Sequence, residues 1–320
     1  MSTTIFDRIR SSCAAVAAVS TYVRIDEAAV ESLAARLDLD LPPNDPGQEP
    51  IGDAESTAAF VLTLDAINFG SGYFPHLRKR PGHSGYHTIA AGLRDWVVAI
   101  GTITPDELRR RTPADWATIF GQELDGSPAE ELIELFTIAL SDLADFVDDR
   151  ADGSFVGVVE QAAGSAAALA EALTAMPFYR DVHEHPIVGP VSLFKRAQIT
   201  VQDLAVAFDR TGMGRFDDLD QLTMFADNLV PHVLRLNQVL VFSDDLLARI
   251  EAVDDIAVGS PQELEIRACG VHAVELLADE VRSTRRADLN TASLDNLLWN
   301  LGAADRYKAI PRHRSRCVFY

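Results

Sequence analysis

The stretch Ser260-Pro261-Gln262-Glu263, with the apolar series that follows it, decides the fold class of this chain. A serine hydroxyl caps a helix by accepting a backbone N–H, proline suits the first turn because it lacks an N–H, and glutamate reaches back to the cap. Downstream, apolar residues recur every three or four positions, at Leu264, Ala268, Val271, Val274, Ala278 and Val281. This spacing predicts a long amphipathic helix after Ser260.

Similar start signals occur at Thr104-Pro105-Asp106-Glu107, Thr112-Pro113-Ala114-Asp115 and Ser127-Pro128-Ala129-Glu130. Helical spacing also covers residues 191–208 and an N-terminal stretch from Ser12 through Glu27, which Asp7 distinguishes from a signal peptide. Only Val97 to Ile103 alternates like a strand, and residues 42–47 (Pro-Pro-Asn-Asp-Pro-Gly) indicate a loop. We expect a mostly α protein with few short strands, a single helical domain over 1–320 with two lobes around a cleft.

Charge limits the partners of this chain. It carries 28 Lys and Arg against 48 Asp and Glu, a net charge of −20. Such a surface repels a polyanion, so we expect a small-molecule substrate and no polymeric nucleic acid. No apolar run reaches about 18 residues, so no membrane partner is expected. Three scattered cysteines favour a cytoplasmic protein without a thiolate zinc site, and we predict no cofactor or metal.

Basic residues are nevertheless concentrated in two stretches that contain no acid. Residues 66–94 contain Arg78, Lys79 and Arg80, and residues 306–320 contain five basic residues beside His313. Each stretch either holds an anionic ligand or pairs with acidic helices elsewhere in the fold.

Two single residues also stand out. Lys195 is one of three lysines in a chain that otherwise uses arginine, and helical spacing places it beside Gln198 on a polar strip. It either reaches into a cleft or extends along the surface into solvent. Asp227 lies between apolar neighbours where a helix is expected to end, so it is either a helix cap or a half-buried functional carboxylate.

Several segments, in order, resemble the queuosine salvage protein family. They span nearly the whole chain: Ile9–Cys13, Asn68-Phe69, Leu193-Phe194-Lys195-Arg196-Ala197-Gln198, Leu222-Thr223-Met224-Phe225-Ala226-Asp227, Glu265-Ile266-Arg267-Ala268 and residues 313–320. The family's aromatic-rich sequence after Asn68-Phe69 is here replaced by Gly-Ser-Gly-Tyr-Phe. The resemblance implies a helical, DNA-glycosylase-like bilobal fold.

The resemblance also implies an activity, hydrolysis of the N-glycosidic bond of queuosine 5'-monophosphate to release the 7-deazapurine base queuine. Asp227 and Lys195 take the catalytic roles. A fixed carboxylate stabilises the positive charge that builds on the sugar, and it can attack the sugar or orient water. Lys195 either keeps Asp227 ionised or binds the sugar. The alternative function is a non-catalytic protein that binds a modified nucleotide or nucleobase.

Seven further residues of the matching regions are expected to contact the substrate: Phe225, Asn228, Asp203, Asn68, Phe69, His313 and Arg314. The C-terminal segment, with His313, Arg314 and Arg316, is the candidate for binding the 5'-phosphate, because guanidinium groups match phosphate oxygens in pairs.

Overall fold

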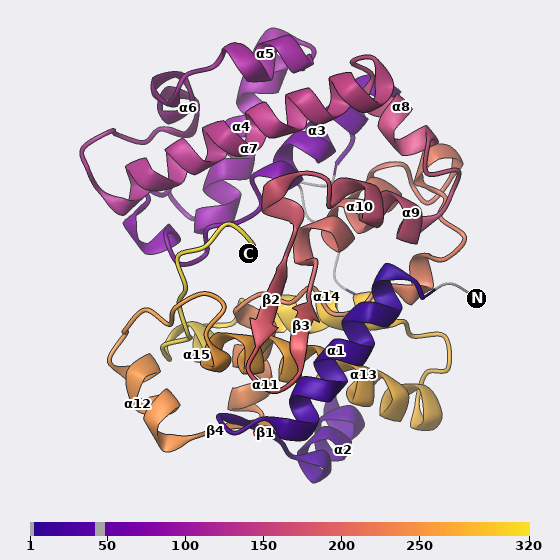
Figure 1. Ribbon diagram of the computed structural model, residues 1–320, viewed down its shortest axis with the longest axis vertical. Helices are drawn as coiled ribbons and strands as arrows, with labels where there is room; N and C mark the ends of the chain where they lie inside the picture. Colours follow the sequence, from indigo (N-terminus) through magenta and orange to yellow (C-terminus); the bar gives the residue numbers. More distant parts are fainter. Residues whose placement is uncertain (1–2, 42–48) are drawn as a thin grey trace. The chain divides into compact units, whose positions relative to one another are not determined.

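The computed structural model describes residues 3–41 and 49–320, and the loop predicted over residues 42–47 lies outside these ranges (Figure 1). Helices dominate the described residues, with short strands in two small sheets, so the prediction of a mostly α fold is confirmed. The chain divides into two compact units, described separately below. The expectation of two lobes around a cleft stays a prediction.

Unit 1 consists of Met1–Pro43, Asp181–Gln198 and Asp220–Arg316. Its elements are α1 (Ile5–Val19), β1 (Val23–Ile25), α2 (Glu27–Arg36), β2 (Val182–His185), β3 (Gly189–Ser192), α11 (Leu229–Leu236), β4 (Leu240–Phe242), α12 (Asp244–Glu251), α13 (Pro261–Thr284), α14 (Thr291–Leu301) and α15 (Asp305–Lys308). Helix α10 (Lys195–Ala207) begins in unit 1 and continues into unit 2, and η5 (Leu219–Gln221) lies at the other boundary.

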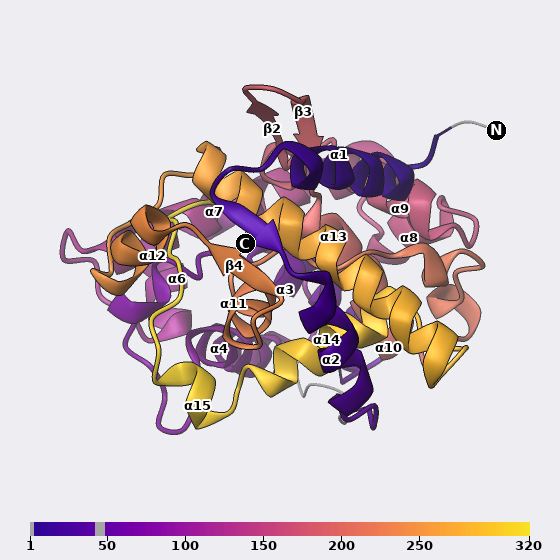
Figure 2. The same cartoon turned by 90° about the horizontal axis from the view of Figure 1, so that it is seen from below.

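Helix α13 forms the centre of unit 1. It begins at Pro261, as the capping signal predicts, and the Ser260 hydroxyl accepts the Glu263 amide at 3.4 Å. Every apolar position of the predicted series is buried. Helices α1, α2, α11 and α14 pack against α13, and Figure 2 shows α1 and α2 lying along it. The apolar repeat therefore becomes the core that supports the residues considered below.

Two small antiparallel sheets of two strands each complete unit 1. Strand β1 pairs with β4, with Val23 opposite Phe242, and β2 pairs with β3, with Val182 opposite Ser192. The helical predictions for residues 20–26 and 191–194 are wrong, because α1 ends at Val19 and because residues 23–25 and 191–192 pair as strands. Ser12 on α1 ties the second hairpin down, since its hydroxyl accepts the Ser192 amide at 3.1 Å.

Unit 2 consists of Asn44–Arg180, Ile199–Leu219 and Cys317–Tyr320. Its elements are α3 (Ala54–Ala66), η2 (Phe74–His76), α4 (Gly85–Ile100), α5 (Pro105–Arg110), α6 (Pro113–Phe120), α7 (Pro128–Ala151), α8 (Phe155–Glu160), α9 (Ala166–Leu173), η3 (Pro177–Tyr179), the rest of α10 and η4 (Gly212–Gly214). The long helix α7 buries one face, and α3, α5, α6 and α8 pack against it. The strand predicted at Val97–Ile103 is wrong, because α4 continues to Ile100 and ends at Gly101 with a positive φ of 87°.

The proline-containing start signals locate helices correctly, but their hydrogen bonds differ. Thr112 and Asp115 form the full reciprocal capping box of α6. The Ser127 side chain makes no capping bond, and Glu130 instead accepts the Gly126 amide. Across the described ranges, no helix has the length and apolar character needed to cross a membrane.

Candidate active site

Asp227 lies near the end of an irregular segment, residues 222–228, that leads into α11. Its Oδ1 accepts hydrogen bonds from the amides of Leu229 at 2.8 Å and Val230 at 3.1 Å. The side chain is half-buried, and no ion pair joins it to a cation in the described part of the chain. Asp227 thus caps the start of α11 from the position before the N-cap residue Asn228, whereas the sequence predicted that a helix ends here. Its second oxygen, Oδ2, makes no hydrogen bond to a described residue, so one carboxylate oxygen remains available for chemistry.

The segment before Asp227 is held by side chains from three helices. Gln198 Oε1 of α10 accepts both the amide and the hydroxyl of Thr223, at 2.8 and 3.1 Å. Asp295 Oδ1 of α14 accepts the Phe225 amide at 3.1 Å. Arg267 Nε of α13 donates to the Ala226 carbonyl at 2.9 Å. These contacts fix the backbone that carries Asp227.

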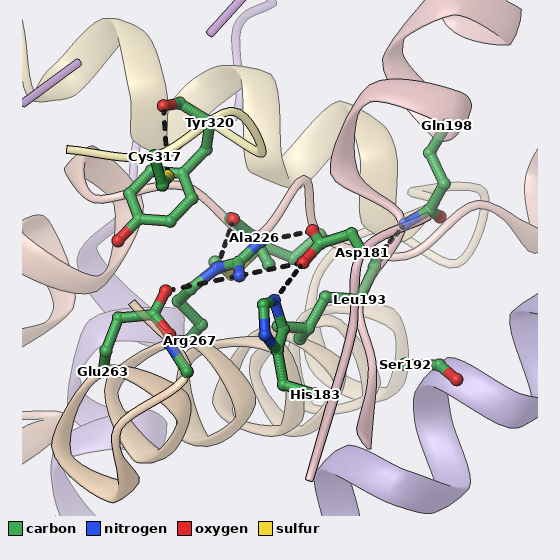
Figure 3. A network of polar contacts seen from close by, with 12 residues as sticks. Asp181, His183, Ser192, Leu193, Gln198, Ala226, Glu263, Arg267, Cys317 and Tyr320 are labelled. Atoms are coloured by element: carbon green, nitrogen blue, oxygen red, sulfur yellow. Dashed lines mark hydrogen bonds and ion pairs between the residues drawn. The ribbon is translucent and has the colours of Figure 1, made fainter. Parts of the chain in front are cut away.

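Arg267 is the centre of a buried polar network (Figure 3). Its guanidinium forms ion pairs with Asp181, at 2.5 Å, and with Glu263 one turn earlier on α13, at 3.3 Å. His183 hydrogen-bonds to Asp181 at 3.0 Å. Burial alone raises the pKa of the Asp181 carboxyl group, but Arg267 and His183 outweigh it and lower this pKa to about 2. The Asp181 carboxyl group therefore stays ionised at neutral pH.

Lys195 is the first residue of α10 and is buried, at 6% relative exposure. The interpretation of a lysine that extends along the surface into solvent is therefore wrong. Gln198 lies one turn further on the same helix and binds the segment that carries Asp227. The preceding residue, Phe194, has a φ of 46°, in the left-handed region that non-glycine residues seldom adopt. This turn directs the chain from β3 into α10 and sets where Lys195 begins the helix.

Asp295 is a functional candidate that the sequence reasoning missed. It lies on α14 and is only 4% exposed. Burial raises the pKa of this carboxyl group well above its usual range, and the charge of Asp227 raises it further, whereas the Phe225 amide and Lys195 act in the opposite direction. Its sequence setting carried a signal, since an acid between Leu294 and Leu297-Leu298 falls on an apolar helix face.

The C-terminal basic segment contributes a second missed residue, Arg312. Arg312 and Arg314 are both half-buried, and neither guanidinium forms a hydrogen bond or ion pair with another described residue. Burial lowers the pKa of the Arg312 guanidinium, and the charge of Asp227 opposes this shift. Arg312 therefore lies within electrostatic reach of Asp227. Arg316 differs, because it is exposed and pairs with Asp255 at 3.1 Å.

Backbone contacts anchor this segment. The carbonyl of His313 accepts the Asn228 side-chain amide at 3.2 Å, and the Arg314 carbonyl accepts the Ile256 amide at 2.8 Å. The His313 ring is buried, and burial together with nearby cations such as Arg267 lowers its pKa to about 3. His313 is therefore neutral at pH 7 and supplies no charge for binding an anion. Asn228 is likewise buried and connects the Asp227 segment to the C-terminal one.

The remaining predicted substrate contacts belong to unit 2. Asn68 donates from Nδ2 to Asp65 Oδ1 at 3.1 Å, and Phe69 packs edge-on against Phe136 and Phe178. Asp203 is buried on α10. Of the predicted set, unit 1 contains Lys195, Phe225, Asp227, Asn228, His313 and Arg314. The roles of all these residues in substrate binding stay predictions.

The other basic stretch, residues 66–94, pairs with acidic residues, which is the second of the two interpretations that its sequence allowed. Arg78 forms an ion pair with Glu123 at 2.5 Å, and Arg80 with Asp95 at 2.8 Å. All four side chains are substantially exposed, so these pairs contribute little to stability.

The fold and this site define a mostly helical protein in which a capped carboxylate, a second buried acid and two half-buried arginines lie in one compact unit. The chain belongs to the queuosine salvage protein family, whose profile matches residues 48–320. A protein of Sphaerobacter thermophilus named queuosine 5'-phosphate N-glycosylase/hydrolase is 36% identical over 271 residues, covering 83% of this chain and 82% of that one. Proteins of the same name from Dictyostelium discoideum (32% over 269 residues; 83% and 79%) and Mus musculus (32% over 293 residues; 85% and 84%) are also similar.

Proposed function

We propose that this protein is an N-glycosidic hydrolase that releases queuine from queuosine 5'-monophosphate. Family membership supports the substrate, and the geometry of Asp227 carries the chemistry. Water adds its oxygen to the sugar C1', the bond from C1' to the base nitrogen breaks, and the departing base keeps the bonding electrons and gains a proton. The products are queuine and ribose 5-phosphate.

Asp227 stabilises the positive charge that develops at C1' as this bond breaks. Its Oδ1 is held by two α11 amides, which orients the group, while Oδ2 is left for the sugar. A carboxylate oriented before the reaction stabilises charge without reorganising during it. Because no ion pair joins Asp227 to a cation among the described residues, we assign Lys195 to the substrate rather than to pairing with Asp227.

Arg312 and Arg314 are the proposed phosphate ligands. Along this extended segment the two arginines alternate with His313 and Ser315, whose side chains are buried. Successive side chains of an extended chain point to opposite sides, so both guanidinium groups lie on the side opposite to those of His313 and Ser315. An arginine pair without an acidic partner is unusual in a chain with a net charge of −20. A phosphate supplies the charge-assisted bonds that the two groups otherwise lack.

The test is incubation of the purified chain with queuosine 5'-monophosphate and detection of free queuine by mass spectrometry. Release by wild type, and none by Asp227→Asn, is the expected result. Binding of the nucleotide without any release by wild type would overturn the hydrolase and favour the non-catalytic binding protein.

A further inference from the structure

Asp295 is in an unusual position for an acidic residue. It lies within α14, is 4% exposed, and has Leu294, Leu297 and Leu298 as buried neighbours on the same helix. Its single hydrogen bond to a described residue comes from the Phe225 amide, at 3.1 Å. No ion pair joins it to a cation in residues 3–41 and 49–320. An ionised carboxylate so buried would need a paired cation, so this surrounding favours the neutral acid.

Charges around Asp295 lead to the same conclusion. Asp227 repels a second negative charge, and Lys195 attracts it without forming an ion pair with Asp295. Four titratable residues on the helices that pack against α14 hydrogen-bond to groups other than Asp295: His232 and Arg235 on α11, and Arg267 and Glu275 on α13. Two nearby carboxyl groups that have no paired cation retain a proton on the more buried member.

The contact with Phe225 gives this buried acid a role. Phe225 lies two residues before Asp227, and its amide would otherwise be a buried donor without an acceptor. We propose that Asp295 is a positioning residue, a neutral carboxyl group that anchors the Phe225 amide and so holds Asp227 in its reactive orientation. Only the expected effect on kcat rests on the proposed function; the protonation of Asp295 and its contact with the Phe225 amide do not.

Three variants separate the parts of the proposal. Asp295→Asn keeps a neutral side chain with an oxygen that accepts the Phe225 amide. Asp295→Leu keeps the approximate size and removes the acceptor. Asp288→Asn is the control, an exposed acid just before α14.

Two measurements need no activity. The infrared spectrum of wild type at pH 7 should contain the carbonyl band of a protonated carboxylic acid, absent from Asp295→Asn and present in Asp288→Asn. Residue-resolved hydrogen exchange should show the Phe225 amide protected in wild type and Asp295→Asn, and exchanging faster in Asp295→Leu. A wild-type spectrum that lacks this band, or equal protection in all variants, would overturn the proposal even if wild type released no queuine.

The kinetic measurement tests the link to Asp227. Asp295→Leu should lower kcat by about 100-fold, as expected for a displaced reacting group, with KM little changed. Asp295→Asn should restore kcat close to the wild-type value. If Asn is as impaired as Leu although both variants melt cooperatively, the charge of Asp295 matters and the proposed neutral anchor is wrong.

Discussion

Arg267 donates a hydrogen bond from Nε to the carbonyl oxygen of Ala226 at 2.9 Å, and Ala226 is the residue immediately before Asp227. The core helix α13 therefore reaches the proposed catalytic carboxylate through one guanidinium. The same guanidinium neutralises two buried acids, so one side chain joins the stability of unit 1 to the position of its site.

Arg267→Met is expected to destabilise the protein strongly. The substitution leaves Asp181 and Glu263 buried without their cation, which costs about 3–5 kcal/mol of unfolding free energy. Urea denaturation at pH 7 measures this loss. The exposed pair Arg80–Asp95 supplies the control, since Arg80→Met should cost less than about 1 kcal/mol. Similar losses in both variants would contradict the buried network.

Asp227→Asn is expected to lower kcat by about 100- to 1,000-fold or more while the substrate still binds. The amide oxygen of asparagine can still accept the Leu229 and Val230 amides, so α11 should remain capped. Activity is measured as queuine release and binding by calorimetry. Asp244→Asn, an exposed acid in the first turn of α12, is the control. Near wild-type turnover in Asp227→Asn would remove Asp227 from the mechanism.

Lys195→Met tests the buried amine. Methionine keeps most of the apolar stem and removes the charge, so the melting temperature should change little while kcat falls by about 100-fold. Lys308→Met, at an exposed lysine of α15, should behave as wild type. Normal turnover in Lys195→Met would mean that Lys195 serves packing alone.

The two arginines without a described partner are expected to determine the preference for nucleotide over nucleoside. Wild type should cleave queuosine 5'-monophosphate with a higher kcat/KM than queuosine. Arg312→Ala and Arg314→Ala should each lower the ratio of these two kcat/KM values. The kcat/KM of both substrates measures it. Rising salt should narrow the wild-type ratio as well, because screening weakens partly exposed ion pairs.

Arg316→Ala is the matched control for this experiment, since Arg316 lies on the same segment and pairs with Asp255. In Arg316→Ala, the ratio of kcat/KM for the nucleotide to kcat/KM for the nucleoside should equal that of wild type. A ratio that changes only in Arg316→Ala would place the phosphate elsewhere on the segment.

Acid should destabilise the fold partly through His313. Its pKa is lowered from 6.5 to about 3, so the unfolded chain binds a proton below pH 6.5 that the folded chain refuses. Stability is therefore lost as the pH falls from 6.5 towards 3. Between pH 7 and pH 5 this residue accounts for about 2 kcal/mol of unfolding free energy. Urea denaturation at both values should show a smaller pH effect in His313→Gln, and identical pH effects would refute the assignment.

The helices were predictable from sequence because their start signals are local. Thr112 and Ser260 cap the helices that their motifs predict, and Asp227 caps α11. Strands β2 and β3 were not predictable from sequence, because each has only four residues and is stabilised by pairing rather than marked by an alternating pattern. Local sequence therefore determined where helices begin, and tertiary pairing determined the strands.

The site was predictable only in part, for a related reason. Lys195 and Asp227 were recognisable from family resemblance and from their unusual chemical settings. Asp295 becomes a candidate only when α14 packs against α11 and α13, which places its carboxyl group beside the Phe225 amide. Likewise, Arg312 and Arg316 look equivalent in sequence, and only the structure shows that Arg316 is exposed and pairs with Asp255 whereas Arg312 is half-buried.

The pairing of β1 with β4 has a consequence for how the protein is made. Val23 finds its partner, Phe242, about 220 residues later in the chain. At translation rates of 5–20 residues per second, the first strand leaves the ribosome roughly 10 to 45 s before the last. During that interval α1 also lacks α13, against which it packs. Its apolar face, with Ile5, Phe6 and Ile9, is then exposed on the nascent chain, and this is where a cotranslational chaperone should bind.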